Sequence, residues 1–166
     1  QLADAHGEDR VSALEELTAY NRVNAMGAIY AAQHGWIGAS FSVAELVTVL
    51  YYSVMRHAPN QADSDLLLLS KGHAAPIQYA ALSGCGYFPI EDLLRYKTPN
   101  GPQAHTDLRT PGIATNTGSL GQTLSKAYGL ARDTDRMVYV VIGDGELQEG
   151  QNFEALRTLA HYRVRN

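Results

Sequence analysis

Cysteine is almost absent from this 166-residue sequence, which contains only Cys85. A single cysteine excludes a disulfide within the chain and fits a reducing compartment. Cys85 stands between two glycines with no base nearby, so we interpret it as structural. The sequence also lacks an apolar run long enough to span a membrane and a signal-peptide pattern at its N-terminus. These absences favour a cytoplasmic protein without membrane contact.

Clusters of positive charge are also missing. The net charge is −4 and the Lys and Arg residues are dispersed, which argues against a nucleic-acid partner. What is present is ordinary for a soluble globular protein, with 45% hydrophobic and 18% charged residues. The length suffices for one domain with a core. We expect residues 1–9, which are polar, to be loose and residues 10–166 to form the domain.

Hydrophobic periodicity predicts an alternation of helices and strands. Helical spacing of apolar residues predicts helices over residues 10–33, 43–56, 74–82, 89–96, 120–131 and 149–162. Residues 66–69 and 137–142 are short apolar runs typical of buried parallel strands. Residues 34–42 are predicted as a loop, and Ser42 with Glu45 forms a capping-box pattern. The fold class is therefore α/β, a parallel sheet with helices on both faces and a ligand at the carboxyl ends of the strands.

The most informative stretch is Val138–Gln151, VYVVIGDGELQEGQ, in which a strand runs into Gly143-Asp144-Gly145. The glycines allow backbone N–H groups to approach an anion closely, and Asp144 lies where the crevice opens. A carboxylate beside a diphosphate is repulsive without a cation between them. The stretch therefore predicts a divalent metal, Mg²⁺ or Ca²⁺, that bridges Asp144 and a diphosphate. The tripeptide is equally compatible with a tight turn in which Asp144 caps the next helix.

Beyond that turn, the string GDGELQEGQNFEAL closely resembles the thiamine-diphosphate motif of transketolases. The strings SKGHAAPIQYAAL, PQAHTD and GIATNTGSLGQTLS resemble three further stretches of that family, so the resemblance spans most of residues 20–166. It implies a thiamine-diphosphate-binding fold, here truncated before its last strands. It also implies that Asp144 is a metal ligand and that Gly145 approaches the diphosphate of the cofactor.

The resemblance assigns roles to two histidines. It implies that His73 hydrogen-bonds the diphosphate or the substrate, and that His105 faces the bound cofactor and substrate. A histidine between a strand end and a helix start is well placed for anions, although a lone histidine there is more often a cap or a surface residue. Lys71 is either a solvated charge or an anion contact.

In the same way, the Gly-Ser-Leu turn is implied to hold the aminopyrimidine ring of the cofactor through Gly118, Ser119 and Leu120. Thr123 replaces a glycine of the family pattern, which adds a hydroxyl group near the cofactor. Glu149 matches a glutamate that shares protons with the active site of the facing subunit. The alternative for Glu149 is an ordinary glutamate at the start of a helix.

One loop departs from the family pattern. Transketolases usually have GHPGGSLS, whose histidine lines the substrate channel, and the string HGWIGASFS places Trp36 at that position. His34 lies two residues earlier. A tryptophan would narrow the channel and add an apolar wall, which favours a smaller or less polar acceptor than the usual sugar phosphates. The alternative is that Trp36 packs at a subunit interface.

The resemblance further implies parts that these residues do not contain. A metal-binding asparagine is expected after one more strand, and Asn166 matches the residue before that strand. The pyrimidine-binding domain, with its activating glutamate, is expected on a second chain, in a dimer or heterotetramer. This chain could thus be the first part of a split enzyme.

The predicted function is thiamine-diphosphate-dependent ketol transfer or carboligation on sugar phosphates or small ketols and aldehydes. Such an enzyme is a transferase that uses thiamine diphosphate with Mg²⁺ or Ca²⁺. The alternatives are a carboligase resembling 1-deoxyxylulose-phosphate synthase and a non-catalytic cofactor-binding subunit. Support is lacking for a generic nucleotide-binding domain, because neither a G-x-G-x-x-G pattern nor a P-loop lysine motif is present.

Overall fold

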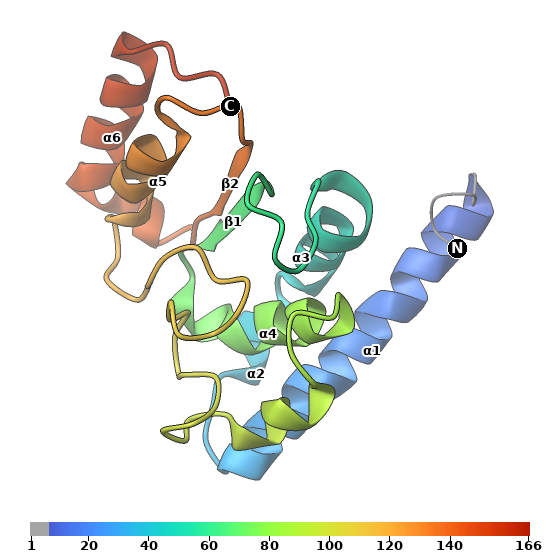
Figure 1. Cartoon of the computed structure of the whole chain (residues 1–166). Helices are drawn as coiled ribbons and strands as arrows, with labels where there is room; N and C mark the ends of the chain where they lie inside the picture. The colour runs from blue at the N-terminus through green and yellow to red at the C-terminus, as the bar shows by residue number, and fades with distance from the viewer. Residues whose placement is uncertain (1–6) are drawn as a thin grey trace.

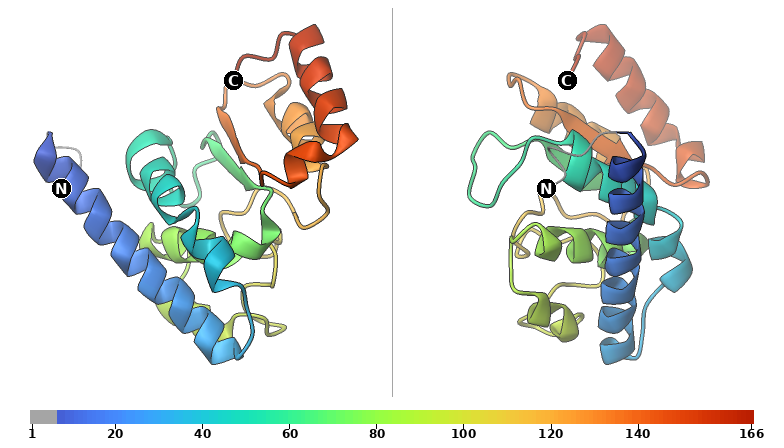
Figure 2. Two further views of the ribbon diagram at one scale, coloured as in Figure 1. Left: turned by 180° about the vertical axis from the view of Figure 1, so that it is seen from behind. Right: turned by 90° about the vertical axis from the view of Figure 1, so that its right-hand side faces the viewer.

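A computed structural model describes residues 7–166 of the chain. Two parallel strands, β1 (Leu66–Leu69) and β2 (Val138–Val141), form the sheet of the described residues, in register from Leu66 with Val138 to Leu69 with Val141. The helices are α1 (Glu8–Ala32), α2 (Ile37–Phe41), α3 (Ala44–Val49), α4 (Ala75–Gly84), α5 (Thr123–Ala131) and α6 (Gly150–His161). The strands separate α5 and α6 from α1, α3 and α4 (Figures 1 and 2). The predicted α/β class with parallel strands is confirmed.

The core is centred on α4, whose buried side chains belong to one cluster with those of α1, α3 and β1. Residues 75–83 of α4 are all buried, and Leu68 and Leu69 of β1 are about as inaccessible. Burying a leucine side chain stabilises a fold by about 1.5–3 kcal/mol, so the four-leucine strand is a strong anchor. The buried amide of Gln78 donates hydrogen bonds to the Tyr51 hydroxyl (2.9 Å) and the Leu67 carbonyl (3.3 Å). These bonds tie α4 to β1 and to the segment after α3 that contains Tyr51.

The region 10–33, whose spacing fits one long helix or two in sequence, forms the single helix α1, and most of the large apolar side chains in it are exposed. It is one helix of 25 residues, and its buried seam consists of Thr18, Asn21, Ala25, Ala28 and Ile29. Larger apolar side chains of the predicted pattern are exposed: Val11, Tyr20, Val23, Met26 and Tyr30. Small residues on the seam allow α1 to approach α3 and α4 closely. The apolar periodicity therefore predicted the helix correctly but not the face that it buries.

The region 34–42 was predicted as a loop, and the structure corrects this with the short helix α2. The capping box is also wrong, because α3 begins after Val43 and has no side-chain cap. The Ser42 hydroxyl instead donates to the Ala39 carbonyl (2.9 Å) and accepts from the Lys71 ammonium (2.8 Å). Glu45 forms an ion pair with Arg22 on α1.

Several element boundaries also differ from the predictions. The helix predicted over 43–56 continues after α3 as a π-helical turn, η1 (Leu50–Val54), and that over 89–96 is the 3₁₀ segment η3 (Ile90–Arg95). α5 begins at residue 123 rather than 120, because Gly121 has a φ of 82°, in the left-handed region outside the α-helical range. α1 begins at Glu8, inside the predicted loose segment, of which residues 1–6 lie outside the described residues.

Both strands end in loops that carry predicted site residues. The Ser70 N–H donates to the Val141 carbonyl (2.8 Å), which extends the pairing beyond β1. From there the chain enters the 3₁₀ turn η2 (Gly72–Ala74), and β2 leads into the Gly-Asp-Gly loop and the 3₁₀ turn η4 (Glu146–Gln148). Parallel strands bring these loops to one edge of the sheet.

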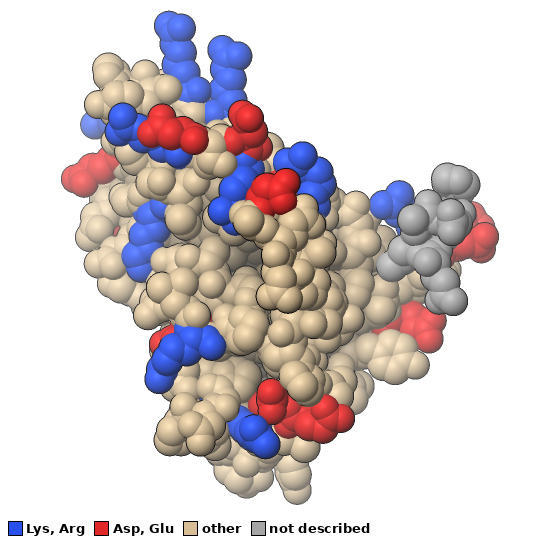
Figure 3. Space-filling model, viewed as in Figure 1, with Lys and Arg blue, Asp and Glu red and all other residues tan. Residues whose placement is uncertain are grey.

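Charged side chains of both signs surround a broad uncharged area on the face shown in Figure 3. No helix within residues 7–166 combines the length and the apolarity needed to cross a membrane.

Candidate functional site

A pocket of about 250 Å³ opens at the carboxyl ends of the two strands. Its lining includes residues that the sequence singled out, from four separate stretches: Lys71, His73, His105, Gly118, Leu120, Asp144 and Gly145. Glu146 also lines it. Ser119 and Glu149 are not part of its wall. The structure thus brings together most of the predicted site residues.

Asp144 projects from the loop between β2 and η4 and is exposed. It caps no helix, because η4 and α6 have Gly145 and Glu149 at their N-cap positions and no side-chain cap. The alternative interpretation of Asp144 as a helix cap is therefore wrong. The backbone N–H groups of Asp144 and Gly145 donate to no other described residue. A carboxylate and two open N–H groups at one point suit a cation and an anion bound together.

His73 and His105 line the pocket together with this loop. Their ring centroids are 5.4 Å apart. The Tyr79 hydroxyl donates to the His105 carbonyl (2.7 Å), which anchors that loop to the buried helix α4. Burial lowers the pKa of His105, and the neighbouring His73 and Lys97 lower it further. His105 therefore favours its neutral form, which can both donate and accept a hydrogen bond.

Two glycines make room for the His105 ring. A Cβ atom at Gly72 would clash with Cδ2 of His105 and would lie 3.1 Å from Cα of Gly118. Gly118 itself has a φ of 122° and approaches the same ring. The segments that carry Gly72, His105 and Gly118 are consequently packed against each other without space for a side chain at either glycine.

The floor of the pocket contains a residue that the sequence interpretation missed, Glu146. Its side chain is 4% exposed, and its carboxylate accepts hydrogen bonds from the Ser70 hydroxyl, the Gly121 N–H (3.0 Å) and the Gly143 N–H (3.1 Å). Asn152 of α6 donates to the Glu146 carbonyl (2.6 Å). One carboxylate thus joins three loops that are distant in the sequence. Nothing in the sequence around Glu146, two residues after Asp144, indicated that its side chain would be buried.

The Gly-Ser-Leu turn lies at the rim of the pocket with Ser119 and Leu120 exposed, and Leu120 retains 51% of its accessible surface. Thr123 was expected to place a hydroxyl near the cofactor. It is buried beneath the turn instead, with its hydroxyl 2.7 Å from that of Ser70. Thr123 therefore supports the floor rather than the pocket wall.

Glu149 stands directly before α6 with its side chain exposed. The Cβ atom of Glu149 lies very close to Gly121. If Gly121 carried a Cβ atom, the two Cβ atoms would be only 2.8 Å apart. Gly121 is therefore needed both for its positive φ and for this contact. The exposure of Glu149 leaves its carboxylate available to another chain.

Trp36, at the start of α2, stacks on His73 with ring centroids 4.1 Å apart and planes inclined by 20°. The His34 ring meets Trp36 edge-on at 5.5 Å. These two residues extend the histidine wall outward from the pocket. Their predicted part in a substrate channel stays a prediction.

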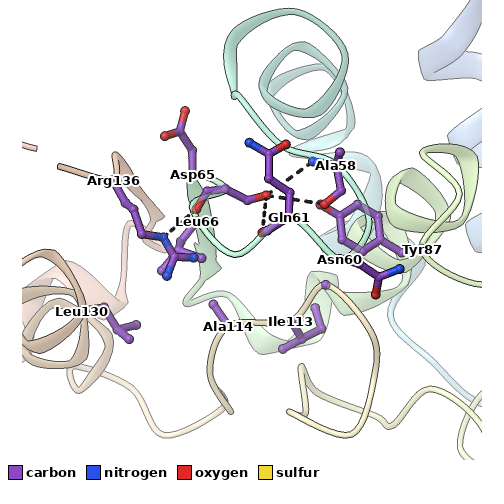
Figure 4. Close-up of a pocket in the computed structure, with 12 residues that line it drawn as sticks. Ala58, Asn60, Gln61, Asp65, Leu66, Tyr87, Ile113, Ala114, Leu130 and Arg136 are labelled. Atoms are coloured by element: carbon purple, nitrogen blue, oxygen red, sulfur yellow. Dashed lines mark hydrogen bonds between the residues drawn. The ribbon is translucent and has the colours of Figure 1, made fainter. Parts of the chain in front are cut away.

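A second cavity, of about 360 Å³, lies at the opposite, amino ends of the strands (Figure 4). Its polar groups largely satisfy one another: Arg136 Nε donates to the Ser64 carbonyl (2.7 Å), and the Ser64 hydroxyl donates to the Gln61 carbonyl (2.9 Å). Asp65 beside it accepts from Arg56 and the Met137 N–H. Ligands of parallel α/β sheets bind at the carboxyl ends, so we assign the site to the first pocket.

The donor set of the first pocket fits a metal and a diphosphate only in part. Asp144 offers a carboxylate, and Lys71 offers a positive charge. Within residues 7–166, however, no cluster of three His, Cys, Asp or Glu side chains could hold a metal ion alone. Further ligands would have to come from the diphosphate, from water or from other protein segments.

Comparison with known proteins gives a consistent result. The family model described as "Transketolase, thiamine diphosphate binding domain" matches residues 14–166. The 6-deoxy-6-sulfo-D-fructose transketolase subunit SqwG of Clostridium sp. (strain MSTE9) is 45% identical over 131 residues, which cover 73% of this chain and 48% of that protein. One subunit of the apulose-4-phosphate transketolase of Actinobacillus succinogenes is 39% identical over 145 residues, 80% of this chain and 51% of that protein.

Solved structures agree. A transketolase from Leishmania mexicana superposes with a TM-score of 0.79 at 28% identity, and the match covers 89% of this chain and 25% of that one. The present chain spans about half the length of the two subunits named above. The chain belongs to the transketolase family, and it carries the family's thiamine diphosphate binding domain.

Proposed function

We propose that this chain supplies the diphosphate- and metal-binding half of the active site in a transketolase-like transferase. The observation that carries the proposal is the pocket in which Asp144, Gly145, His73 and His105 converge from three loops. The names of the relatives support it, because two of them are subunits of transketolases. The substrates that fit this proposal are sugar phosphates or related small ketols and aldehydes.

In this proposal, Asp144 holds Mg²⁺ or Ca²⁺, and the N–H of Gly145 contacts the diphosphate. Thiamine diphosphate, when bound, supplies the electron sink for making and breaking a carbon–carbon bond beside a carbonyl group. Gly118, Ser119 and Leu120 form the adjacent rim and contact the ring system. The charge of Lys71 adds to the attraction for the diphosphate.

His73 and His105 would orient the substrate and hold or transfer protons at its hydroxyl and carbonyl oxygens. Neutral imidazole suits this role, because one ring nitrogen donates while the other accepts. The lowered pKa of His105 keeps it in that form near neutral pH. Trp36, stacked on His73, fixes the orientation of that ring and borders the substrate channel.

A second chain would complete the site. It would carry the pyrimidine-binding domain and face the exposed Glu149, which would share protons with it across the interface. The assembly would be a dimer or heterotetramer of cytoplasmic enzyme subunits. Exposed apolar side chains of the neighbouring segments, Leu120 and Phe153 at 51% each, are consistent with a contact there.

The experiment that tests the proposal is native mass spectrometry of the native assembly, meaning the full-length chain with whatever chains co-purify, after addition of Mg²⁺ and thiamine diphosphate. We expect a second polypeptide, the cofactor mass and ketol transfer in a parallel assay. Retained cofactor without turnover would indicate a non-catalytic binding subunit. Failure to retain the cofactor with every co-purifying chain present would contradict the proposal.

A further inference from the structure

Two buried tyrosines hold the backbone at His105. The Tyr79 hydroxyl donates to the His105 carbonyl (2.7 Å), and the Tyr96 hydroxyl donates to the carbonyl of the preceding residue, Ala104 (3.2 Å). Both tyrosines are 1% exposed, and burial raises the pKa of both, that of Tyr96 to about 12. Both hydroxyl groups therefore keep their protons and remain donors. A buried hydroxyl group needs a partner, and these two have theirs in one short segment.

The next carbonyl along this segment is bonded as well. The Thr106 carbonyl accepts from the Thr117 N–H (3.1 Å), and the hydroxyl oxygens of these two threonines are 2.7 Å apart. Three consecutive carbonyls, of residues 104–106, are thus bonded to distant parts of the chain, although the segment belongs to no helix or strand. Such a backbone has little freedom to move, so the direction of the His105 side chain is set.

Tyr79 also links His105 to the helix that follows His73. The turn η2, which contains His73, leads directly into α4, and residues 75–83 of α4 are buried. His73 is therefore fixed at the start of α4 by the chain itself, whereas His105 is fixed to the middle of the same helix by the Tyr79 hydroxyl. One buried helix thus sets the distance between the two imidazole rings, whose centroids are 5.4 Å apart.

The distance between the rings matters because both line the pocket. In the proposed function they act on one substrate, and a displacement of about 1 Å in such an arrangement can lower the rate about a hundredfold. Gly72 and Gly118 make room for the His105 ring, but room alone does not hold it. The two tyrosine hydroxyls supply the directional bonds that do.

We propose that Tyr79, with Tyr96 beside it, is a positioning residue that holds His105 at its working distance from His73. The two tyrosine rings are neighbours, with centroids 6.4 Å apart, and neither is part of the pocket lining. Both act through the backbone of the His105 segment. The inference rests on the proposed function and adds to it two residues that touch neither cofactor nor substrate.

Removal of the Tyr79 hydroxyl alone tests the proposal. Tyr79→Phe keeps the ring in the core and leaves the His105 carbonyl without this donor. The native assembly is assayed for ketol transfer with a sugar-phosphate donor and acceptor. In this variant, kcat should fall by about tenfold or more, while KM and the affinity for thiamine diphosphate should change by less than about twofold. Tyr96→Phe, which removes the longer bond, should have a smaller effect in the same direction.

Tyr51→Phe is the matched control. Tyr51 is 5% exposed, and its hydroxyl accepts a hydrogen bond from Gln78, the neighbour of Tyr79 on α4 (2.9 Å). This variant also loses one buried hydrogen bond to α4, but it leaves the bonds of the His105 segment intact. Both variants should lower the midpoint of thermal unfolding by a similar few degrees, and only Tyr79→Phe should lower kcat.

A second background shows whether Tyr79 acts through His105. His105→Asn removes the imidazole, so the position of this residue no longer matters for proton transfer. Tyr79→Phe should therefore lower kcat by about tenfold or more when His105 is present but by less than about twofold in His105→Asn. An equal loss in both backgrounds would contradict the proposal.

Hydrogen–deuterium exchange examines the same segment without turnover. Peptides that cover residues 104–117 should exchange faster in Tyr79→Phe than in the wild type, and those of Tyr51→Phe should match the wild type. Unchanged exchange in Tyr79→Phe, or a kcat equal to that of Tyr51→Phe, would overturn the positioning role. Absent turnover of the wild type would instead contradict the proposed function, and the exchange of residues 104–117 would still decide whether Tyr79 holds this segment.

Discussion

The floor and the mouth of the site are built in opposite ways. At the floor, the buried carboxylate of Glu146 is satisfied by two backbone N–H groups and a hydroxyl. At the mouth, which consists of Trp36, His34 and Lys97, the Trp36 ring stacks on His73 and lies beneath the Lys97 ammonium, and a single hydrogen bond joins Lys97 to His34. Directional bonds hold the floor rigid, whereas stacked rings allow the mouth to adjust to a ligand. The floor positions the loops, and in the proposed function the mouth borders the path of the substrate.

Two carboxylates that are two residues apart show the same contrast. Asp144 is exposed and has no partner among the described residues, whereas Glu146 is 4% exposed and accepts three hydrogen bonds. The exposed carboxylate of Asp144 contributes little to the stability of the fold and remains free to bind a ligand. The buried carboxylate of Glu146 stabilises the fold through its hydrogen bonds and is not free to bind a ligand. Substitutions at the two positions should therefore affect different measurements.

The largest expected effect is that of Asp144→Ala on cofactor binding. The diphosphate would lose its metal bridge, and Mg²⁺-dependent affinity for thiamine diphosphate should fall by more than about a hundredfold, since even outer partners of a metal site are worth about 10–100-fold. Calorimetric titration of the native assembly measures this, and the midpoint of thermal unfolding should hardly change without ligand. Unaltered affinity would refute the assignment of Asp144 as a metal ligand.

Next in size is the effect of Glu146→Gln on stability. The glutamine amide would present N–H groups to donors that now bond a carboxylate, and a buried bond to a charged group is worth about 1.5–3 kcal/mol. We expect a loss of about that size in the free energy of unfolding by urea. Glu154→Gln on the exposed face of α6 is the matched control and should stay within about 0.5 kcal/mol. Equal stability of both variants would mean that the floor is not held by this carboxylate.

At the mouth, Trp36→His should change selectivity more than stability. The smaller ring widens the channel, so activity toward ordinary sugar phosphates should rise by about tenfold relative to small aldehydes, the lower end of what one methylene group is worth in a pocket. Comparison of kcat/KM across acceptors of increasing length measures it. An unchanged acceptor profile would show that Trp36 only packs.

The smallest expected effect concerns His105 and pH. Its pKa is lowered in the folded chain, so the unfolded chain takes up the proton first as the pH falls below the ordinary value of about 6.5. Folding stability from this residue should therefore decrease between about pH 7 and pH 5 and be constant above that window. Thermal unfolding of wild type should decline more steeply over this range than that of His105→Asn, while His161→Asn, which removes an exposed histidine of α6, should follow wild type. Parallel curves for all three would exclude the lowered pKa.

The sequence alone predicted the elements whose signals are local. Four consecutive leucines between polar residues specified β1, and the apolar run before Gly143 specified β2, because a short buried strand depends only on its own composition. His73 and Asp144 follow the two strands, so the parallel sheet predicts that they lie at one edge, whereas the place of His105 beside them was implied only by the family resemblance.

Other features depended on partners that no local pattern reveals. The apolar periodicity of α1 predicted a helix, but the seam of small residues is buried because close approach to α4 favours it over the larger side chains. Ser42 and Glu45 matched a capping box, yet Lys71 and Arg22 provided alternative partners for them.

What the sequence determined by itself is the α/β class, the two strands, the family and the residues of the pocket wall. What only the tertiary structure decided is the floor and the mouth: the burial of Glu146 beneath three loops and the position of Lys97 over Trp36, 61 residues away in the sequence. The physical reason is that both depend on contacts between distant segments. The identity of a charged residue says that it can bind a partner, and only the fold says whether that partner is the protein or a ligand.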